Sequence, residues 1–154
     1  KSKNIICVAP DVGGTERARA LGKILGVDLA IVDKRRPSPG KSKVMNVIGD
    51  VANKTCIIVD DIIDSGGTIV NAAQALRDRG AKEVYVYITH GVLSGDAVTK
   101  IEKSVIKKLV ITDSIDNIEK VKKAKNIEVM TISKLMAEAI NRISNSTSVS
   151  DLFK

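Results

Sequence analysis

The sequence has 154 residues, 44% of them hydrophobic, which suits one globular domain with a substantial core and excludes a disordered chain. No apolar run reaches the roughly 18 residues of a membrane span, and the first ten residues do not resemble a signal peptide, so we expect a soluble, cytoplasmic protein with no membrane partner. The net charge of +7 suits an anionic partner, but three aromatic residues are too few to stack on bases, which favours a small phosphorylated ligand over nucleic acid.

Short apolar runs rich in valine and isoleucine predict six strands. They cover residues 4–9, 28–33, 55–60, 83–89, 107–112 and 127–132. Helical periodicity predicts helices over residues 15–26, 68–80, 94–104 and 133–144. The alternation predicts an α/β fold, a doubly wound and mostly parallel sheet with helices on both faces, in a single domain over residues 1–154.

The connection over residues 34–54 is unusually long for a compact domain and contains Pro37 and Pro39. Connections of this length are usually lids, binding loops or disordered segments. Within it, residues 44–51 could form a short amphipathic helix or an edge strand, and periodicity alone does not decide between them.

Two adjacent carboxylates, Asp60 and Asp61, follow the strand predicted to end near Val59. When ionised they repel each other unless each finds hydrogen-bond donors or a cation, and a vicinal diol offers one hydroxyl to each carboxylate. A glycine-rich turn then leads into a helix, through Asp64, Ser65, Gly66, Gly67 and Thr68. Backbone amides at such a turn favour a phosphate, so the two features together predict a sugar-phosphate site.

A similar turn follows the first predicted strand, where Asp11 precedes Gly13 and Gly14 at the start of a helix. The turn could hold a second phosphate, and the Asp11 carboxylate could meet a Mg²⁺ ion carried by that ligand. The alternative is an ordinary glycine-rich turn between a strand and a helix.

Positive charge and the single histidine mark two further strand ends. In an extended segment Lys34 and Arg36 point to one side, so they could close over a polyphosphate; a solvated surface cluster is the alternative. His90 directly follows the strand predicted over residues 83–89, and we expect it to support the site more than to contact the ligand.

Several of these motifs resemble a known family. VDDIIDSGGT, residues 59–68, resembles the 5-phosphoribosyl 1-pyrophosphate (PRPP) motif of type I phosphoribosyltransferase folds. The segments 10–23, 30–37, 44–51 and 148–153 are similar, in order, to the C-terminal half of the ribose-phosphate pyrophosphokinases, also called PRPP synthetases. The resemblance covers nearly the whole chain.

This resemblance implies an enzyme that transfers the diphosphoryl group of MgATP to the anomeric hydroxyl of ribose 5-phosphate, giving PRPP and AMP. It implies that Asp60 and Asp61 hold the ribose hydroxyls and that residues 64–68 hold the 5-phosphate. Lys34 and Arg36 would be catalytic cations on a flexible loop.

The resemblance assigns roles to two further groups. Asp11 would bind Mg²⁺, and Gly13, Gly14 and Arg17 would complete a pyrophosphate loop. In the C-terminal tail, the residues that match a possible allosteric nucleotide site are Ser148, Ser150 and Phe153.

Family members carry a preceding, homologous N-terminal domain that this chain lacks, so we expect a fragment that is inactive or weakly active alone. The family also implies a homo-oligomer, commonly a hexamer. Two other functions stay open: a nucleobase phosphoribosyltransferase, and a non-catalytic PRPP-binding regulatory or associated subunit.

Overall fold

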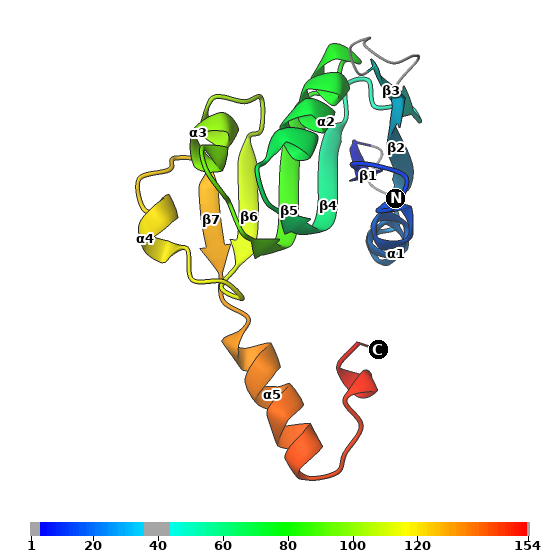
Figure 1. Ribbon diagram of the computed structural model, residues 1–154. Coiled ribbons are helices and arrows are strands. Elements are labelled where there is room, and N and C mark those ends of the chain that lie inside the picture. The colour runs from blue at the N-terminus through cyan, green and yellow to red at the C-terminus, as the bar shows by residue number, and fades with distance from the viewer. Residues whose placement is uncertain (1–3, 36–43, 154) are drawn as a thin grey trace.

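The computed structural model describes residues 4–35 and 44–153, and it confirms the predicted α/β sheet (Figure 1). Seven strands lie in the order β3-β2-β1-β4-β5-β6-β7. Their bounds are β1 Ile5–Ala9, β2 Asp28–Arg35, β3 Val44–Ile48, β4 Thr55–Ile63, β5 Glu83–Gly91, β6 Lys108–Thr112 and β7 Ile127–Met130. Every neighbouring pair is parallel except β2 with β3, which is antiparallel.

Four helices cover the two faces of this sheet: α1 Thr15–Leu25, α2 Gly67–Asp78, α3 Ala97–Glu102 and α4 Ile118–Val121. They are followed by α5 Ser133–Ser144 and a 3₁₀ helix, Ser150–Phe153. The chain passes from β1 to β2 in one direction across the sheet and from β4 to β7 in the other. Because crossovers between parallel strands are right-handed, these opposite directions place α1 on one face and α2, α3 and α4 on the other.

The strand order reverses between β1 and β4, which are neighbours although α1, β2 and β3 separate them in the chain. Cys7 in β1 pairs with Ile57 in β4, and both strands are largely buried. In open α/β sheets the crevice beyond the carboxyl ends of the strands at such a reversal is the usual ligand site. The fold therefore directs attention to the residues that follow β1 and β4.

The ambiguous segment over residues 44–51 begins with an edge strand, β3, so the helical alternative is wrong. Val47 of β3 lies opposite Val32 of β2 and both are buried, whereas Asn46 and Ile48 are exposed. This alternation is the period of a half-buried strand. The loop tip over residues 36–43 lies outside the described residues.

Two strands run further than predicted. β4 continues to Ile63 and β5 to Gly91, because the two strands keep pairing beyond the aspartates, with Ile62 opposite His90. The short helix α4 was not predicted, since four residues carry too little periodicity to reveal it.

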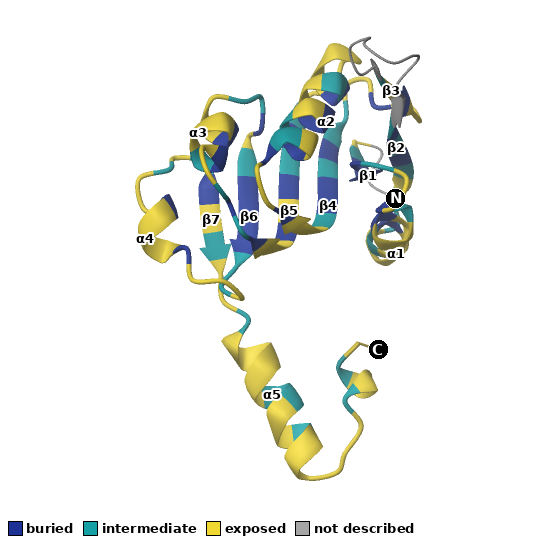
Figure 2. Ribbon diagram, in the orientation of Figure 1, coloured by how far each residue is buried: buried dark blue, intermediate teal, exposed yellow. Residues whose placement is uncertain are grey.

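The C-terminal helix α5 extends away from the sheet and is exposed (Figure 2). Within the described residues none of α5 is buried, and its apolar side chains are exposed at Leu135, Met136, Ile140 and Ile143. The tail is tied back to this helix where Arg142 Nη1 donates to the Ser148 carbonyl oxygen at 2.9 Å. None of the described helices is long and apolar enough to cross a membrane.

Candidate sugar-phosphate site

A pocket of about 220 Å³ lies at the carboxyl ends of β1 and β4. Most of the residues predicted for the sugar-phosphate site line it: Asp11, Asp60, Asp64, Ser65, Gly66, Gly67 and Thr68. Three isoleucines complete its wall, Ile62, Ile63 and Ile69. The sequence motifs indicated polar and glycine residues only. They did not indicate the isoleucines of the wall, although Ile62 and Ile63 lie within the same motif.

The glycine-rich turn before α2 has the geometry expected of an anion site. Gly66 is the N-cap of α2 and has φ +77°, in the left-handed region that only glycine adopts readily. Val70 N donates to Gly66 O at 3.0 Å, so the amides of Gly67, Thr68 and Ile69 come before the first bond of the helix. Among the described residues no side chain caps this end, which leaves the first-turn amides able to meet a phosphate.

The second turn, between β1 and α1, is held by Asp11. Its Oδ1 accepts a hydrogen bond from Gly14 N at 2.9 Å, which fixes the start of α1. A Cβ atom on Gly13 would lie 3.3 Å from Asp11 Oδ1, so the backbone approaches the carboxylate closely there. Of this turn only Asp11 is among the residues that line the pocket, and the binding of a second phosphate at Gly13 and Gly14 stays a prediction.

Asp11 also fits a magnesium ligand. Among the described residues no hydrogen bond or ion pair reaches its Oδ2, and no group of three or more metal-ligating side chains exists. An ion here would be held by one carboxylate and by oxygens of the ligand. Mg²⁺ bound to phosphates has this preference, because it keeps most of its shell as water and ligand oxygen.

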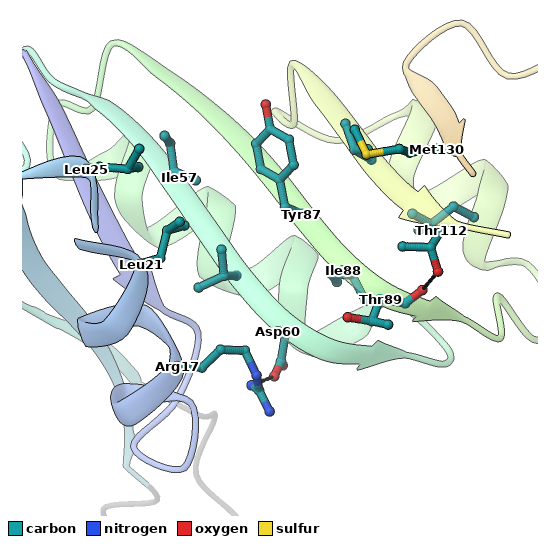
Figure 3. A pocket seen from close by; sticks show the side chains of 13 residues that line it. Arg17, Leu21, Leu25, Ile57, Asp60, Tyr87, Ile88, Thr89, Thr112 and Met130 are labelled. Atoms are coloured by element: carbon teal, nitrogen blue, oxygen red, sulfur yellow. Dashed lines mark hydrogen bonds and ion pairs between the residues drawn. The ribbon is translucent and has the colours of Figure 1, made fainter. Parts of the chain in front are cut away.

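Arg17 reaches across from α1 to the aspartate pair. Its Nη1 lies 2.6 Å from Asp60 Oδ1 and its Nη2 lies 2.9 Å from Asp61 Oδ2. Figure 3 shows the guanidinium of Arg17 against the Asp60 carboxylate. Sequence reasoning placed Arg17 in the pyrophosphate loop and did not foresee this contact, which joins residues 43 positions apart.

The two aspartates differ in their electrostatic surroundings. Burial raises the pKa of Asp60, and the neighbouring Asp61 charge adds to this, while the Asp61 amide and Arg17 offset part of the rise. Burial also raises the pKa of Asp61, but Arg17 and hydrogen bonds from Asp60 and the backbone outweigh this effect and hold the pKa of Asp61 below its usual value. The pair is thus arranged so that Asp61 ionises first.

His90 supports the strand ends and does not line the pocket. The Ser114 hydroxyl donates to Thr89 O at 3.1 Å, so its oxygen accepts from His90 Nδ1, 2.9 Å away. The ring therefore links the end of β5 to the turn that follows β6, and its role in the site stays a prediction.

Other predicted residues lie apart from the pocket or outside the described residues. Lys34 belongs to β2, paired with Met45, and Arg36 is outside the described residues, so the structure does not test the predicted catalytic cations. The candidate allosteric residues lie in the tail, beyond α5 and far from the sheet (Figure 1). There Ser148 Oγ and Ser150 Oγ lie 3.0 Å apart and Phe153 is exposed.

A larger hollow of about 560 Å³ lies beside α1, over β4 to β7 (Figure 3). Its lining is mainly apolar, with Leu21 and Leu25 from α1 facing Ile57 and Tyr87 on the sheet. It shares only Asp60 with the smaller pocket. A sugar phosphate needs polar partners, so the smaller pocket is the better candidate.

The α/β sheet, with a carboxylate pair and a glycine-rich turn at its switch point, has a phosphoribosyltransferase-type fold. A family model, the phosphoribosyl synthetase-associated domain, matches residues 30–154, and the chain belongs to this family.

Comparisons with individual proteins agree. The chain is 60% identical to a ribose-phosphate pyrophosphokinase of Hyphomonas neptunium, covering 98% of this chain and 49% of that protein. It is 51% identical to one from Buchnera aphidicola subsp. Schizaphis graminum, over 99% of this chain and 49% of that protein. A crystal structure of phosphoribosylpyrophosphate synthetase from Mycobacterium smegmatis superposes with a TM-score of 0.84 at 35% sequence identity. The match covers 93% of this chain and 46% of that chain. The chain thus spans about half the length of the curated relatives it matches.

Proposed function

We propose that this chain is the ribose 5-phosphate-binding half of a ribose-phosphate pyrophosphokinase. The complete protein would transfer the diphosphoryl group of MgATP to the C1 hydroxyl of ribose 5-phosphate, giving PRPP and AMP. The observation that carries the proposal is the pocket of about 220 Å³ in which Asp60 and the Gly66–Gly67 turn face the same space. A diol and a phosphate on one small molecule fit these two groups.

Each side of the pocket has its part in binding. Asp60, which lines the pocket, and its neighbour Asp61, which is not among the lining residues, accept hydrogen bonds from the ribose hydroxyls, which orients the sugar ring. The amides at the start of α2, with the hydroxyls of Ser65 and Thr68 beside them, hold the 5-phosphate. Fixing both ends of the sugar places its C1 hydroxyl at one position, which lowers the entropic part of the barrier.

The diphosphate is held by the Asp11 turn. At the start of α1 the amides of Gly14 and Thr15 already donate to Asp11 Oδ1 and Val12 O, so the next amides, of Glu16 and Arg17, would meet the diphosphate oxygens. Asp11 would hold Mg²⁺, which would supply positive charge near the transferring group. We assign the remaining charge stabilisation to Lys34 and Arg36, as the family resemblance implies. Losing one such preorganised donor typically costs roughly 10²- to 10³-fold in rate.

The reaction balances without a redox partner. The C1 oxygen forms a bond to the β-phosphorus of ATP, and the bond from that phosphorus to the oxygen bridging it to the α-phosphorus breaks. AMP leaves with the bridging oxygen, and the C1 hydroxyl proton passes to solvent.

By family membership we also propose Mg²⁺ as the cofactor, a cytoplasmic location, and a homo-oligomer, a hexamer in the family pattern. ATP binding would require the other half of the protein, so the 154-residue chain should turn over weakly or not at all. The Ser148, Ser150 and Phe153 region would contribute to a regulatory nucleotide site.

The test is calorimetric titration of the chain with ribose 5-phosphate and, separately, with ribose and with inorganic phosphate. Binding of ribose 5-phosphate at least tenfold tighter than either fragment supports a site that reads both ends of the molecule. Equal affinity for inorganic phosphate would reject the diol assignment. PRPP consumption with any nucleobase would point instead to a phosphoribosyltransferase.

A further inference from the structure

The guanidinium of Arg17 forms ion pairs with two carboxylates in this site. Arg17 contacts Asp60 Oδ1 at 2.6 Å and Asp61 Oδ2 at 2.9 Å, through two different nitrogens. Asp60 Oδ1 also accepts the amide of Asp61 at 3.0 Å. The positive charge that keeps the two adjacent carboxylates from repelling each other is therefore supplied by α1, not by β4 where they reside.

The sugar and Arg17 bind the same two carboxylates. If the proposed function is right, ribose hydroxyls donate to Asp60 and Asp61, which Arg17 contacts at Asp60 Oδ1 and Asp61 Oδ2. Each carboxylate also has a second oxygen that Arg17 does not contact. A diol that donates to the two contacted oxygens takes the places of the guanidinium nitrogens, so a sugar bound in this way displaces Arg17.

The guanidinium of Arg17 has a second possible contact site, the turn before α1. In a helix, side chains point back toward the N-terminus, over the residues three and four positions earlier. For Arg17 these are Gly14 and Gly13, which form the turn beside Asp11. Its side chain is 41% exposed, so the guanidinium is accessible to a ligand from solvent. A diphosphate at this turn would lie within reach of the guanidinium.

We infer that Arg17 couples the two halves of the ligand site, contacting Asp60 and Asp61 when the sugar is absent and a diphosphate at the Gly13–Gly14 turn when the sugar is bound. This inference rests on the proposed function. The sugar frees the guanidinium for the diphosphate, and the diphosphate removes the guanidinium from the sugar's carboxylates. By thermodynamic linkage each ligand then raises the affinity for the other by the same factor.

The coupling can be measured on the chain as it stands. Ribose 5-phosphate is titrated by calorimetry into the protein with Mg²⁺ alone, and again with Mg²⁺ and saturating inorganic pyrophosphate. Couplings of this kind are typically roughly 5- to 150-fold, and we expect a value in that range for the wild-type chain. The reverse titration, pyrophosphate with and without ribose 5-phosphate, must give the same factor.

Three variants test whether the coupling depends on Arg17. Arg17→Gln removes the shared cation, so the coupling factor between ribose 5-phosphate and pyrophosphate should fall to about twofold or less. This should hold whatever the variant does to the affinity for either ligand alone. Arg17→Lys keeps the charge but not the paired donors, so an intermediate factor is expected. Arg19→Gln is the matched control: Arg19 is exposed on the same helix, makes no hydrogen bond or ion pair with the described residues, and should retain the wild-type factor.

The outcomes separate the two proposals. Binding of ribose 5-phosphate to the wild-type chain tests the proposed function, and its absence would reject that function and this inference together. Binding without coupling, or coupling that survives in Arg17→Gln, would overturn the role of Arg17 and leave the proposed function standing. Circular dichroism spectra and melting temperatures of the variants show whether a lost factor reflects lost folding.

Discussion

The carboxylates of Asp60 and Asp61 are consecutive in the chain but differ sharply in exposure, 18% for the Asp60 side chain and 59% for Asp61. Asp60 Oδ1 accepts a hydrogen bond from the amide of Asp61 at 3.0 Å, so the backbone at the end of β4 stabilises one carboxylate and leaves the other exposed. Asp60 is the less exposed member and lines the pocket, whereas Asp61 is the more exposed member and lies outside the pocket lining. Each aspartate therefore has its own expected phenotype.

Asp61→Asn should weaken ribose 5-phosphate binding with little effect on folding. The variant keeps the shape of the side chain but loses an ionised acceptor, and hydrogen bonds to charged groups are worth roughly 1.5–3 kcal/mol, which is roughly 10- to 150-fold in affinity. Calorimetric titration measures the change. Asp50→Asn is a suitable control, because Asp50 is an exposed aspartate that pairs with Lys54, follows β3 and does not belong to the carboxylate pair on β4. Unaltered binding in Asp61→Asn would remove this residue from the diol site.

The raised pKa of Asp60 predicts a pH-dependent stability. A folded-state pKa above the unfolded value means that Asp60 contributes most to stability at low pH and that this contribution is lost as the pH rises through the raised pKa. Asp60→Asn is neutral at every pH, so it should melt a few degrees above wild type at pH 7 and lose this advantage toward pH 3. Thermal unfolding of both proteins at low salt, from pH 3 to pH 7, makes the comparison. A difference that stays constant with pH would contradict the assignment.

The main parts of the site could be predicted from the sequence because their signals are local. An apolar run that ends in two aspartates, and a Gly66–Gly67 turn that opens a helix, each fit within about ten residues. The parallel sheet then brings the ends of β1 and β4 together. This is why Asp11 and the Gly66–Thr68 turn meet in one pocket.

What the sequence could not reveal depends on contacts between distant segments. Arg17 lies 43 residues from Asp60, and nothing in the local pattern of α1 distinguishes it from Arg19. The length of β4 likewise depends on its pairing with β5, where Ile63 lies opposite Gly91. Both features follow from the assembled sheet and so become visible only in the structure.

The left-handed backbone of Gly66 predicts a cost for any side chain there. At φ +77° an alanine pays roughly 1–2 kcal/mol, although its Cβ would meet its nearest neighbours at 3.8 Å, an ordinary contact distance. Gly66→Ala should therefore lower the free energy of unfolding by about that amount. Gly67→Ala is the matched control, because Gly67 lies at the start of α2, outside the positive-φ region, and the nearest contact of a Cβ atom there would be Ser65 Oγ at 4.0 Å. Urea unfolding should show little or no loss in that variant, and equal losses in both would argue against backbone strain.

Close packing at Gly91 provides a different kind of test. A Cβ atom there would lie 2.7 Å from Cδ1 of Ile111 on the neighbouring strand β6, so Gly91→Ala should cost about 1–3 kcal/mol through overpacking. Ile111→Val removes that Cδ1 atom and alone should cost about 0.5–1.5 kcal/mol. Because the two side chains compete for one space, the double variant should lose less than the sum of the single losses. In the double variant the overpacking should be relieved only in part, since the Cγ2 atom at position 111 would still lie 3.1 Å from the new Cβ atom at position 91. Urea unfolding of all four proteins measures the interaction, and strictly additive losses would show that the strain at Gly91 has another source.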